Sequence, residues 1–223
     1  MMSGHRAPLA QEVTAWLREA VVSGRWALHE RIPSEFELMA HLEVSRGTLR
    51  EAVKALTHAG MLEVRRGDGT YVRAASEIDG AARQAYREHT DEEVLQLRFA
   101  LDTQAARLAA RTAEDEDLVA LRAMLDRRRE AWAARDVEPW IAADWQFHLK
   151  VAESSGNGLL HELYASFGDV FHGTKMAQRL RDGFDGCRRA GHETLVAAIA
   201  ARDEDAAVAT VNANLEYCMS WMP

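Results

Sequence analysis

The chain has 223 residues, of which 48% are hydrophobic and 28% are charged, so it can bury a substantial core. Its formal net charge is −8, yet residues 1–73 carry +1 and the remaining residues carry −9. This asymmetry indicates that one part of the chain meets a polyanion. We expect a reduced, cytoplasmic protein without membrane contact, because no apolar run could span a bilayer, no signal peptide is evident and the two cysteines lack metal-type spacing.

The N-terminal part predicts a winged helix-turn-helix. Apolar residues recur at helical spacing in the first segment. Ser34 and Glu37 then form a capping box, Ser45 is an N-cap, and a Gly-rich turn separates two short extended runs. Three helices followed by a β-hairpin are typical of this DNA-binding motif. The predicted elements are helices at 9–23, 34–41 and from Ser45 to Gly60, and a hairpin within 61–73 around Arg66-Gly67-Asp68-Gly69.

The C-terminal part predicts an antiparallel bundle of about six helices, so the fold class is mainly α. Amphipathic segments with short links follow one another, and no strand pattern interrupts them. Residues 74–90 lack a clear period and are expected to be a linker, with a partly helical conformation as an option, between a domain at 1–73 and a domain at 91–223. The predicted bundle helices are at 91–111, 114–135, 137–154, about 158–180, 184–201 and 204–221.

A basic face runs along the third helix. Arg46, Arg50 and Lys54 are spaced four residues apart and therefore share one side of the helix. Such a run is commonly just a solvated surface. Here it begins where a helix-turn-helix meets DNA, with Ser45 and Thr48 adding hydroxyl groups in the same turn, and arginines recur at the hairpin tip. Because arginine binds guanine or phosphate in a bidentate manner, we interpret this face as a DNA-reading surface.

Polar residues lie on apolar faces of the predicted bundle. Asp144 and His148 are four residues apart on an inward helix face, and His192 and Asn214 lie on apolar seams of later helices. A carboxylate in a core is costly unless it is paired or ligates a metal. An aspartate with imidazoles suits Zn²⁺, Ni²⁺ or Mn²⁺. Alternatively, Asp144 and His148 pair with each other, and each histidine is a hydrogen-bonded core residue. The arginine run 127–129 is expected to be solvated.

The N-terminal part resembles the DNA-binding domain of GntR-family bacterial transcription regulators. The matching elements are Pro33-Ser34-Glu35, Val44-Ser45-Arg46, Leu49-Arg50-Glu51-Ala52 and Gly67-x-Gly69-Thr70. The resemblance implies operator contacts from Arg46, Arg50 and the wing tip. A departure stands at Phe36, where the family often has a DNA-contacting arginine, so we expect an operator that differs from the family consensus. The expected DNA-contacting residues are Arg31, Ser45, Arg46, Thr48, Arg50, Arg66, Gly67 and Gly69.

The C-terminal part is similar to the FCD ligand-binding domain. The similarity is carried by Leu97-Arg98 with Asp102, by "DWQFHLKVAESSGN", and by His192 ahead of "LVAAI". It implies a divalent metal held by one aspartate and three histidines, and an effector carboxylate held by Arg98, which could instead pair with Asp102. The expected metal ligands are Asp144, His148, His192 and, at the fourth position, Asn214.

Asn214 is the departure in this set, because a neutral amide oxygen is a weak ligand for such metals. The site could be open with three ligands, could use Asn214 weakly, could recruit His172, or could have lost its metal.

The sequence therefore predicts a non-enzymatic, ligand-responsive regulator. We expect a homodimeric repressor that is released from an inverted-repeat DNA operator by a small carboxylate bound near the metal. Three alternatives stay open: a metal-independent regulator with a larger or uncharged effector, a metal-dependent enzyme, and an architectural DNA-binding protein.

Overall fold

The computed structural model describes residues 9–168 and 191–219. It is mainly helical and divides into two compact units, Met1–Ala85 and Tyr86–Pro223. Within the described residues, no helix combines the length and apolar character that a membrane span requires. Each unit has a hydrophobic core of its own.

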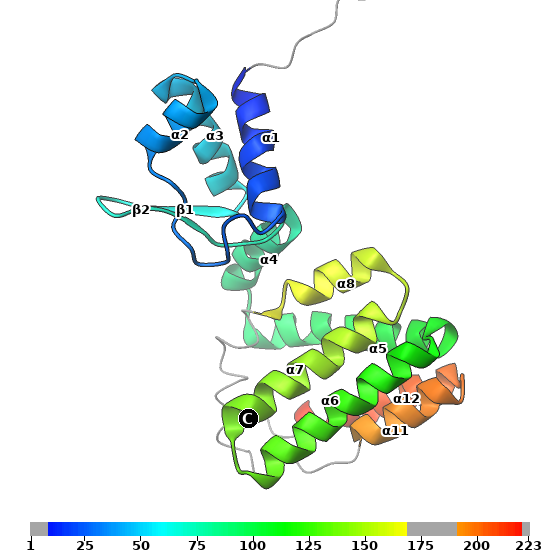
Figure 1. The fold of residues 1–223 in the computed structure, drawn as a ribbon. Helices are drawn as coiled ribbons and strands as arrows, with labels where there is room; N and C mark the ends of the chain where they lie inside the picture. Colours follow the sequence, from blue (N-terminus) through cyan, green and yellow to red (C-terminus); the bar gives the residue numbers. More distant parts are fainter. Residues whose placement is uncertain (1–8, 169–190, 220–223) are drawn as a thin grey trace, which may run out of the picture. The chain divides into compact units, whose positions relative to one another are not determined.

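The first unit is a winged helix-turn-helix, as predicted. Both predicted N-caps form, since the Ser34 and Ser45 side chains accept hydrogen bonds from the third residue of their helices. Leu17, Leu49 and Leu56 are completely buried and join the helices into one core. The elements are α1 (Leu9–Val22), α2 (Glu35–Leu42), α3 (Arg46–His58), and the antiparallel strands β1 (Leu62–Arg65) and β2 (Gly69–Val72) (Figure 1).

A fourth helix, α4 (Glu77–Glu88), occupies the segment for which the sequence predicts a linker, residues 74–90. Its start packs against the end of α3 through glycine backbone. A Cβ on Gly80 would lie 2.2 Å from the carbonyl oxygen of Ala59, and one on Gly60 would lie 2.6 Å from the carbonyl oxygen of Gly80. Ile78, Ala82 and Tyr86 also recur at helical spacing along α4 and are partly buried, so the helix has an apolar stripe in addition to this backbone contact.

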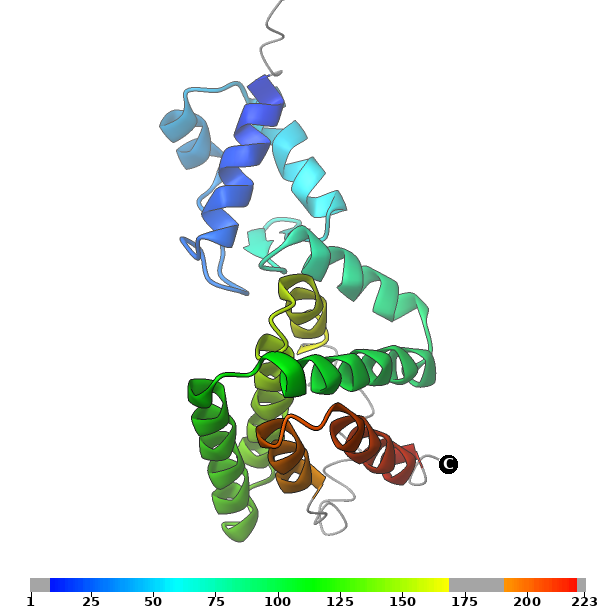
Figure 2. The ribbon, with the colours of Figure 1, turned by 90° about the vertical axis from the view of Figure 1, so that its right-hand side faces the viewer.

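The second unit is the predicted helical bundle. α6 packs along α7, α12 packs along α5, and α11 contacts α12, α5 and α6 (Figures 1 and 2). The helix predicted over about 158–180 is interrupted, because the helix that begins there ends at Ala165; residues 169–180 of that prediction lie outside the described residues. Ser166 turns its hydroxyl back onto the carbonyl of Leu163 (2.6 Å), a local bond that competes with helix continuation. The described helices are α5 (Asp91–Thr112), α6 (Asp115–Ala133), α7 (Val137–Glu153), α8 (Gly158–Ala165), α11 (Gly191–Ala200) and α12 (Glu204–Met219).

The bundle core contains charged side chains among large apolar ones. Trp140, Phe147 and Tyr164 are at most 1% exposed, which is typical of a well-packed interior. Charged side chains bury themselves in this interior only when they are paired or ligate a metal. Four of them are less than 10% exposed in the bundle: Arg98, Asp102, Arg128 and Asp144.

Candidate metal centre and DNA-contacting face

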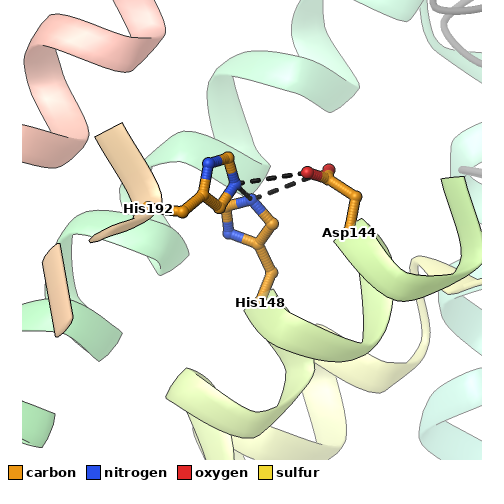
Figure 3. Close-up of side chains that lie close together, drawn as sticks. All are labelled: Asp144, His148 and His192. Carbon is orange, nitrogen blue, oxygen red and sulfur yellow. Dashed lines mark hydrogen bonds and ion pairs between the residues drawn. The ribbon is translucent and has the colours of Figure 1, made fainter. Parts of the chain in front are cut away.

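Asp144, His148 and His192 converge in the bundle interior (Figure 3). α7 carries the first two residues one turn apart, and the second residue of α11 supplies His192. His192 Nε2 lies 3.1 Å from His148 Nε2 and 3.2 Å from Asp144 Oδ1. His148 Nε2 lies 3.9 Å from Asp144 Oδ2. The structure thus brings together three of the four predicted metal ligands.

The donor atoms suit a first-row transition metal. Metal–nitrogen bonds of 2.0–2.1 Å in a tetrahedron put neighbouring ligand atoms about 3.4 Å apart. The two distances from His192 Nε2, 3.1 and 3.2 Å, are close to this value. Two imidazole nitrogens and one carboxylate oxygen also suit such an ion better than Ca²⁺, which takes oxygen ligands.

Asp102 contacts the His148 ring on the side opposite Asp144 and His192. His148 Nδ1 lies 3.3 Å from Asp102 Oδ1. When Nδ1 donates its hydrogen to this carboxylate, the lone pair of Nε2 faces Asp144 and His192. Metal-binding histidines commonly have such an outer carboxylate, which fixes the ring and its tautomer. The sequence pointed to Asp102 only as a partner of Arg98.

Arg128 also belongs to this site. The prediction that it lies on a solvated surface is wrong. It is 9% exposed, and its Nε donates a hydrogen bond to Asp144 Oδ1 at 2.7 Å. Its guanidinium also stacks over Trp140, 4.7 Å from the ring centre. The helical period could have identified it, because position 128 follows the buried Leu125 by three residues and Leu121 by seven.

Arg98 is buried beside the site and paired there. Its Nε donates to the Tyr164 hydroxyl at 3.1 Å and lies 3.5 Å from Asp102 Oδ2. The same hydroxyl donates to Asp102 Oδ1 at 2.7 Å. The pairing with Asp102 that the spacing suggested is therefore present, while an effector contact stays a prediction. The sequence did not predict a role for Tyr164, because this residue is 66 positions from Arg98 and only the folded chain brings the two together.

The protonation states follow from burial and charge. Burial would raise the pKa of Asp144, but Arg128, His192 and His148 together outweigh this effect and hold that pKa well below its ordinary value. Burial lowers the pKa of His192, so its ring is neutral at pH 7. Burial also raises the pKa of Tyr164 well above its ordinary value, so the hydroxyl stays protonated and can donate to Asp102.

Asn214, the fourth predicted ligand, lies beside the residue that precedes His192. A Cβ on Gly191 would fall 1.9 Å from Asn214 Oδ1, so the carboxamide packs directly on that glycine. This contact puts the amide near the start of α11, and its role as a ligand stays a prediction. The alternative ligand His172 lies outside the described residues.

The predicted DNA-contacting arginines of α3 are exposed. The side chains of Arg46 and Arg50 are 64% and 63% exposed, and both meet the carboxylate of Glu35, at 3.7 and 2.9 Å. Lys54 is also exposed, and Ser45 bonds Thr48 at the start of the helix. A surface ion pair of this kind is weak, so both arginines can exchange Glu35 for phosphate or base.

The wing also presents cations and open backbone. Arg66 and Gly67 are exposed at its tip, where Gly67 adopts φ +77°. Arg31 pairs with Tyr71 as a β-bridge. The Arg31 side chain also lies against Gly69, where an added Cβ would come within 2.4 Å of the Arg31 Nε atom. Gly69 therefore leaves room for the Arg31 side chain to lie across the wing.

Comparison with known proteins identifies both parts of the chain. Residues 9–72 match the model of bacterial regulatory proteins of the gntR family, and residues 93–217 match that of the FCD domain. A solved structure titled Streptococcus agalactiae GntR covers 95% of this chain and 98% of its own at a TM-score of 0.56 and 24% identity. At that identity the likeness concerns the fold alone.

Two curated relatives share parts of the sequence. The Uxu operon transcriptional regulator of Escherichia coli K12 is 30% identical over 69% of this chain and 61% of its own length. The histidine utilization repressor of Klebsiella aerogenes is 42% identical over 30% of this chain and 27% of its own. The match thus spans less than two thirds of either relative. With both family models matched in order, the chain belongs to the GntR family of bacterial transcription regulators, in its FCD subfamily.

Proposed function

We propose that the protein is a repressor that binds operator DNA through α3 and the wing and releases it when the bundle binds a small carboxylate. The observation that carries the proposal is the division of charge between the two units. Cations are exposed on the α3 face, whereas in the bundle charged side chains converge in the interior. The first arrangement suits a polyanion that displaces weak surface pairs, and the second suits an enclosed ligand.

The effector is proposed to be an anion because of the charges that surround the metal site. Arg98 and Arg128 balance Asp102 and Asp144, and His192 is neutral. A divalent metal on Asp144, His148 and His192 would leave two uncompensated positive charges in the interior, which an anion can neutralise. With three protein ligands, a metal keeps an open position, which a carboxylate oxygen would suit.

Metal in this site would supply a Lewis-acidic contact for that carboxylate. The protein's own residues would hold the arrangement, since Asp102 fixes the His148 ring and Arg128 fixes the Asp144 carboxylate. Asn214 lies on Gly191 beside His192 and is proposed as a weak fourth ligand, which the effector carboxylate would displace from the metal.

Repression and a two-fold operator are part of the same proposal. The histidine utilization repressor is 42% identical over 30% of this chain, and its name favours the same direction of control. One winged unit reads one half-site, so we propose a homodimer on an inverted repeat. Sequencing of DNA fragments selected by the purified protein tests this symmetry, and an asymmetric single site would contradict the homodimer.

The DNA-binding part is tested with Arg50→Ala on the selected operator. We expect a loss of about 1–3 kcal/mol in binding free energy with an unchanged unfolding curve, because Arg50 is exposed. Arg129→Ala is the matched control, since it removes an arginine of similar exposure, 62%, from α6 in the bundle. Equal binding by both variants would remove α3 from the interface.

The effector part is tested by metal content and ligand response. Wild-type protein dialysed against Zn²⁺, Ni²⁺ or Mn²⁺ should retain about one metal per chain, and His148→Ala should retain none. Small carboxylates should then raise the melting temperature of the metal-loaded wild type and release it from operator DNA. Absence of metal from the wild type would contradict the metal site, and an uncharged effector would contradict the carboxylate.

A further inference from the structure

An exposed aromatic ring lies at the edge of the cationic α3 face. Phe36, in the first turn of α2, is 78% exposed, more than any other large hydrophobic side chain among the described residues. A single exposed hydrophobic residue needs no explanation by itself. The neighbourhood of Phe36 is what matters, because the ring contributes little to the core of its unit and yet stands beside the residues proposed to read DNA.

The position of Phe36 follows from its two neighbours in α2. Leu38, two residues on, is 3% exposed and faces the core, so at 100° per residue Phe36 points away from the core. Glu35, one residue before, holds Arg50 at 2.9 Å and Arg46 at 3.7 Å. Phe36 therefore follows, in the first turn of α2, the residue that pairs with both arginines.

The ring can recognise one feature of double-stranded DNA. It carries no hydrogen-bonding group, so it can bind neither a phosphate nor the polar edge of a base. In the major groove, the C5-methyl group of thymine is the apolar contact that a phenylalanine side chain can make. The adjoining arginines would hold the nearby phosphates or guanines and bring the ring to the groove.

We infer that Phe36 reads a thymine methyl group at one position in each half of the operator, next to the bases or phosphates held by Arg46 and Arg50. The inference rests on the proposed DNA-binding function of α3. It adds a base preference, thymine, that the arginines cannot provide, because guanidinium groups select guanine or phosphate.

The experiment replaces each thymine of the selected operator, one symmetric pair at a time, with deoxyuridine, which lacks only the methyl group. Binding of wild-type protein should weaken at one pair of positions by about fourfold per half-site, the effect of exposing one buried methyl-sized group. Phe36→Ala should bind the unmodified operator more weakly by at least the same factor. It should then be insensitive to deoxyuridine at that pair, so that the two changes are not additive.

Controls separate this inference from the proposed function. Phe36→Leu keeps an apolar contact and should retain part of the deoxyuridine effect. The unfolding curves of both variants should match that of the wild type, because the ring is exposed. If Arg50→Ala also leaves binding unchanged, α3 is not the interface and the proposed function fails with the inference.

Two results would overturn the inference alone. In the first, deoxyuridine weakens wild-type and Phe36→Ala protein equally at every position. In the second, Phe36→Ala loses affinity to the same extent on all DNA sequences, which would indicate a wedge between base steps or a contact with another protein rather than a base-specific contact.

Discussion

The two units contain the same kind of ion pair in opposite surroundings. In the DNA-binding unit, Arg50 meets Glu35 at 2.9 Å with side chains 63% and 44% exposed. In the bundle, Arg128 meets Asp144 at 2.7 Å with side chains 11% and 10% exposed. The distances hardly differ, so the surroundings decide what each pair contributes.

Solvent screens the attraction between the charges of the first pair, whereas the second pair is largely buried from solvent. An exposed pair typically contributes 0–1 kcal/mol, so DNA can replace Glu35 at little cost. Removing one partner of a buried pair leaves the other charge uncompensated, which costs about 3–5 kcal/mol. Exchangeable pairs suit a surface that must release its ligand, and locked pairs suit a site that must keep its shape.

The largest test of this comparison is Arg128→Ala. It should lower the free energy of unfolding of the bundle by about 3–5 kcal/mol, because Asp144 would stay buried without its cation. Chemical unfolding in the presence of a chelator measures the loss. Arg129→Ala, one residue on and 62% exposed, should change it by less than about 1 kcal/mol. Equal effects would show that burial does not separate the two arginines.

A second test compares two tyrosine hydroxyls. Tyr164→Phe removes a buried hydroxyl that bonds both Arg98 and Asp102, and should cost about 1–3 kcal/mol because both charges lose a partner. Tyr71→Phe removes a hydroxyl bonded to Asp68 at an exposed position, and should cost less. Thermal unfolding of the two variants side by side would reveal the difference, and a larger effect at Tyr71 would refute the comparison.

The smallest effect is expected for Glu35→Gln. The unfolding free energy should change by less than about 1 kcal/mol, since the pairs that Glu35 makes are exposed. Operator affinity should rise a few-fold and depend more steeply on salt, because a negative charge leaves the face that is proposed to meet phosphate. Glu12→Gln makes the same change of charge in α1 and serves as the control. Weaker operator binding would instead assign Glu35 an essential role in orienting Arg50.

Local sequence signals predicted most of the fold. Capping residues such as Ser34 and Ser45 act within one helical turn, so their effect is visible in the sequence alone. The helix α4 was predicted only as an optional part of a linker, although Ile78, Ala82 and Tyr86 recur on it at helical spacing. The feature that no sequence pattern indicates is the backbone contact between Gly60 and Gly80, which holds the start of α4 against the end of α3.

The candidate site was predicted only in part. Asp144, His148 and His192 stood out as polar residues on apolar seams. Arg128 did not stand out, because a run of three arginines has the appearance of a solvated surface. The three residues nevertheless point in different directions around the helix, and only Arg128 is buried. Tyr164 and Asp102 are 62 residues apart in the sequence, and no local sequence pattern predicts a contact at that separation.

The glycine contact between α3 and α4 bears on how this protein can be recombined with others. The first turns of α4 cover the carbonyl of Ala59 and the backbone of Gly60, so they belong physically with the winged unit. A chimera that joins a foreign sensor directly after the wing, at residue 73, would strip that cover from the end of α3. A junction inside α4, after Ala85, would carry the cover along and transplant the whole unit.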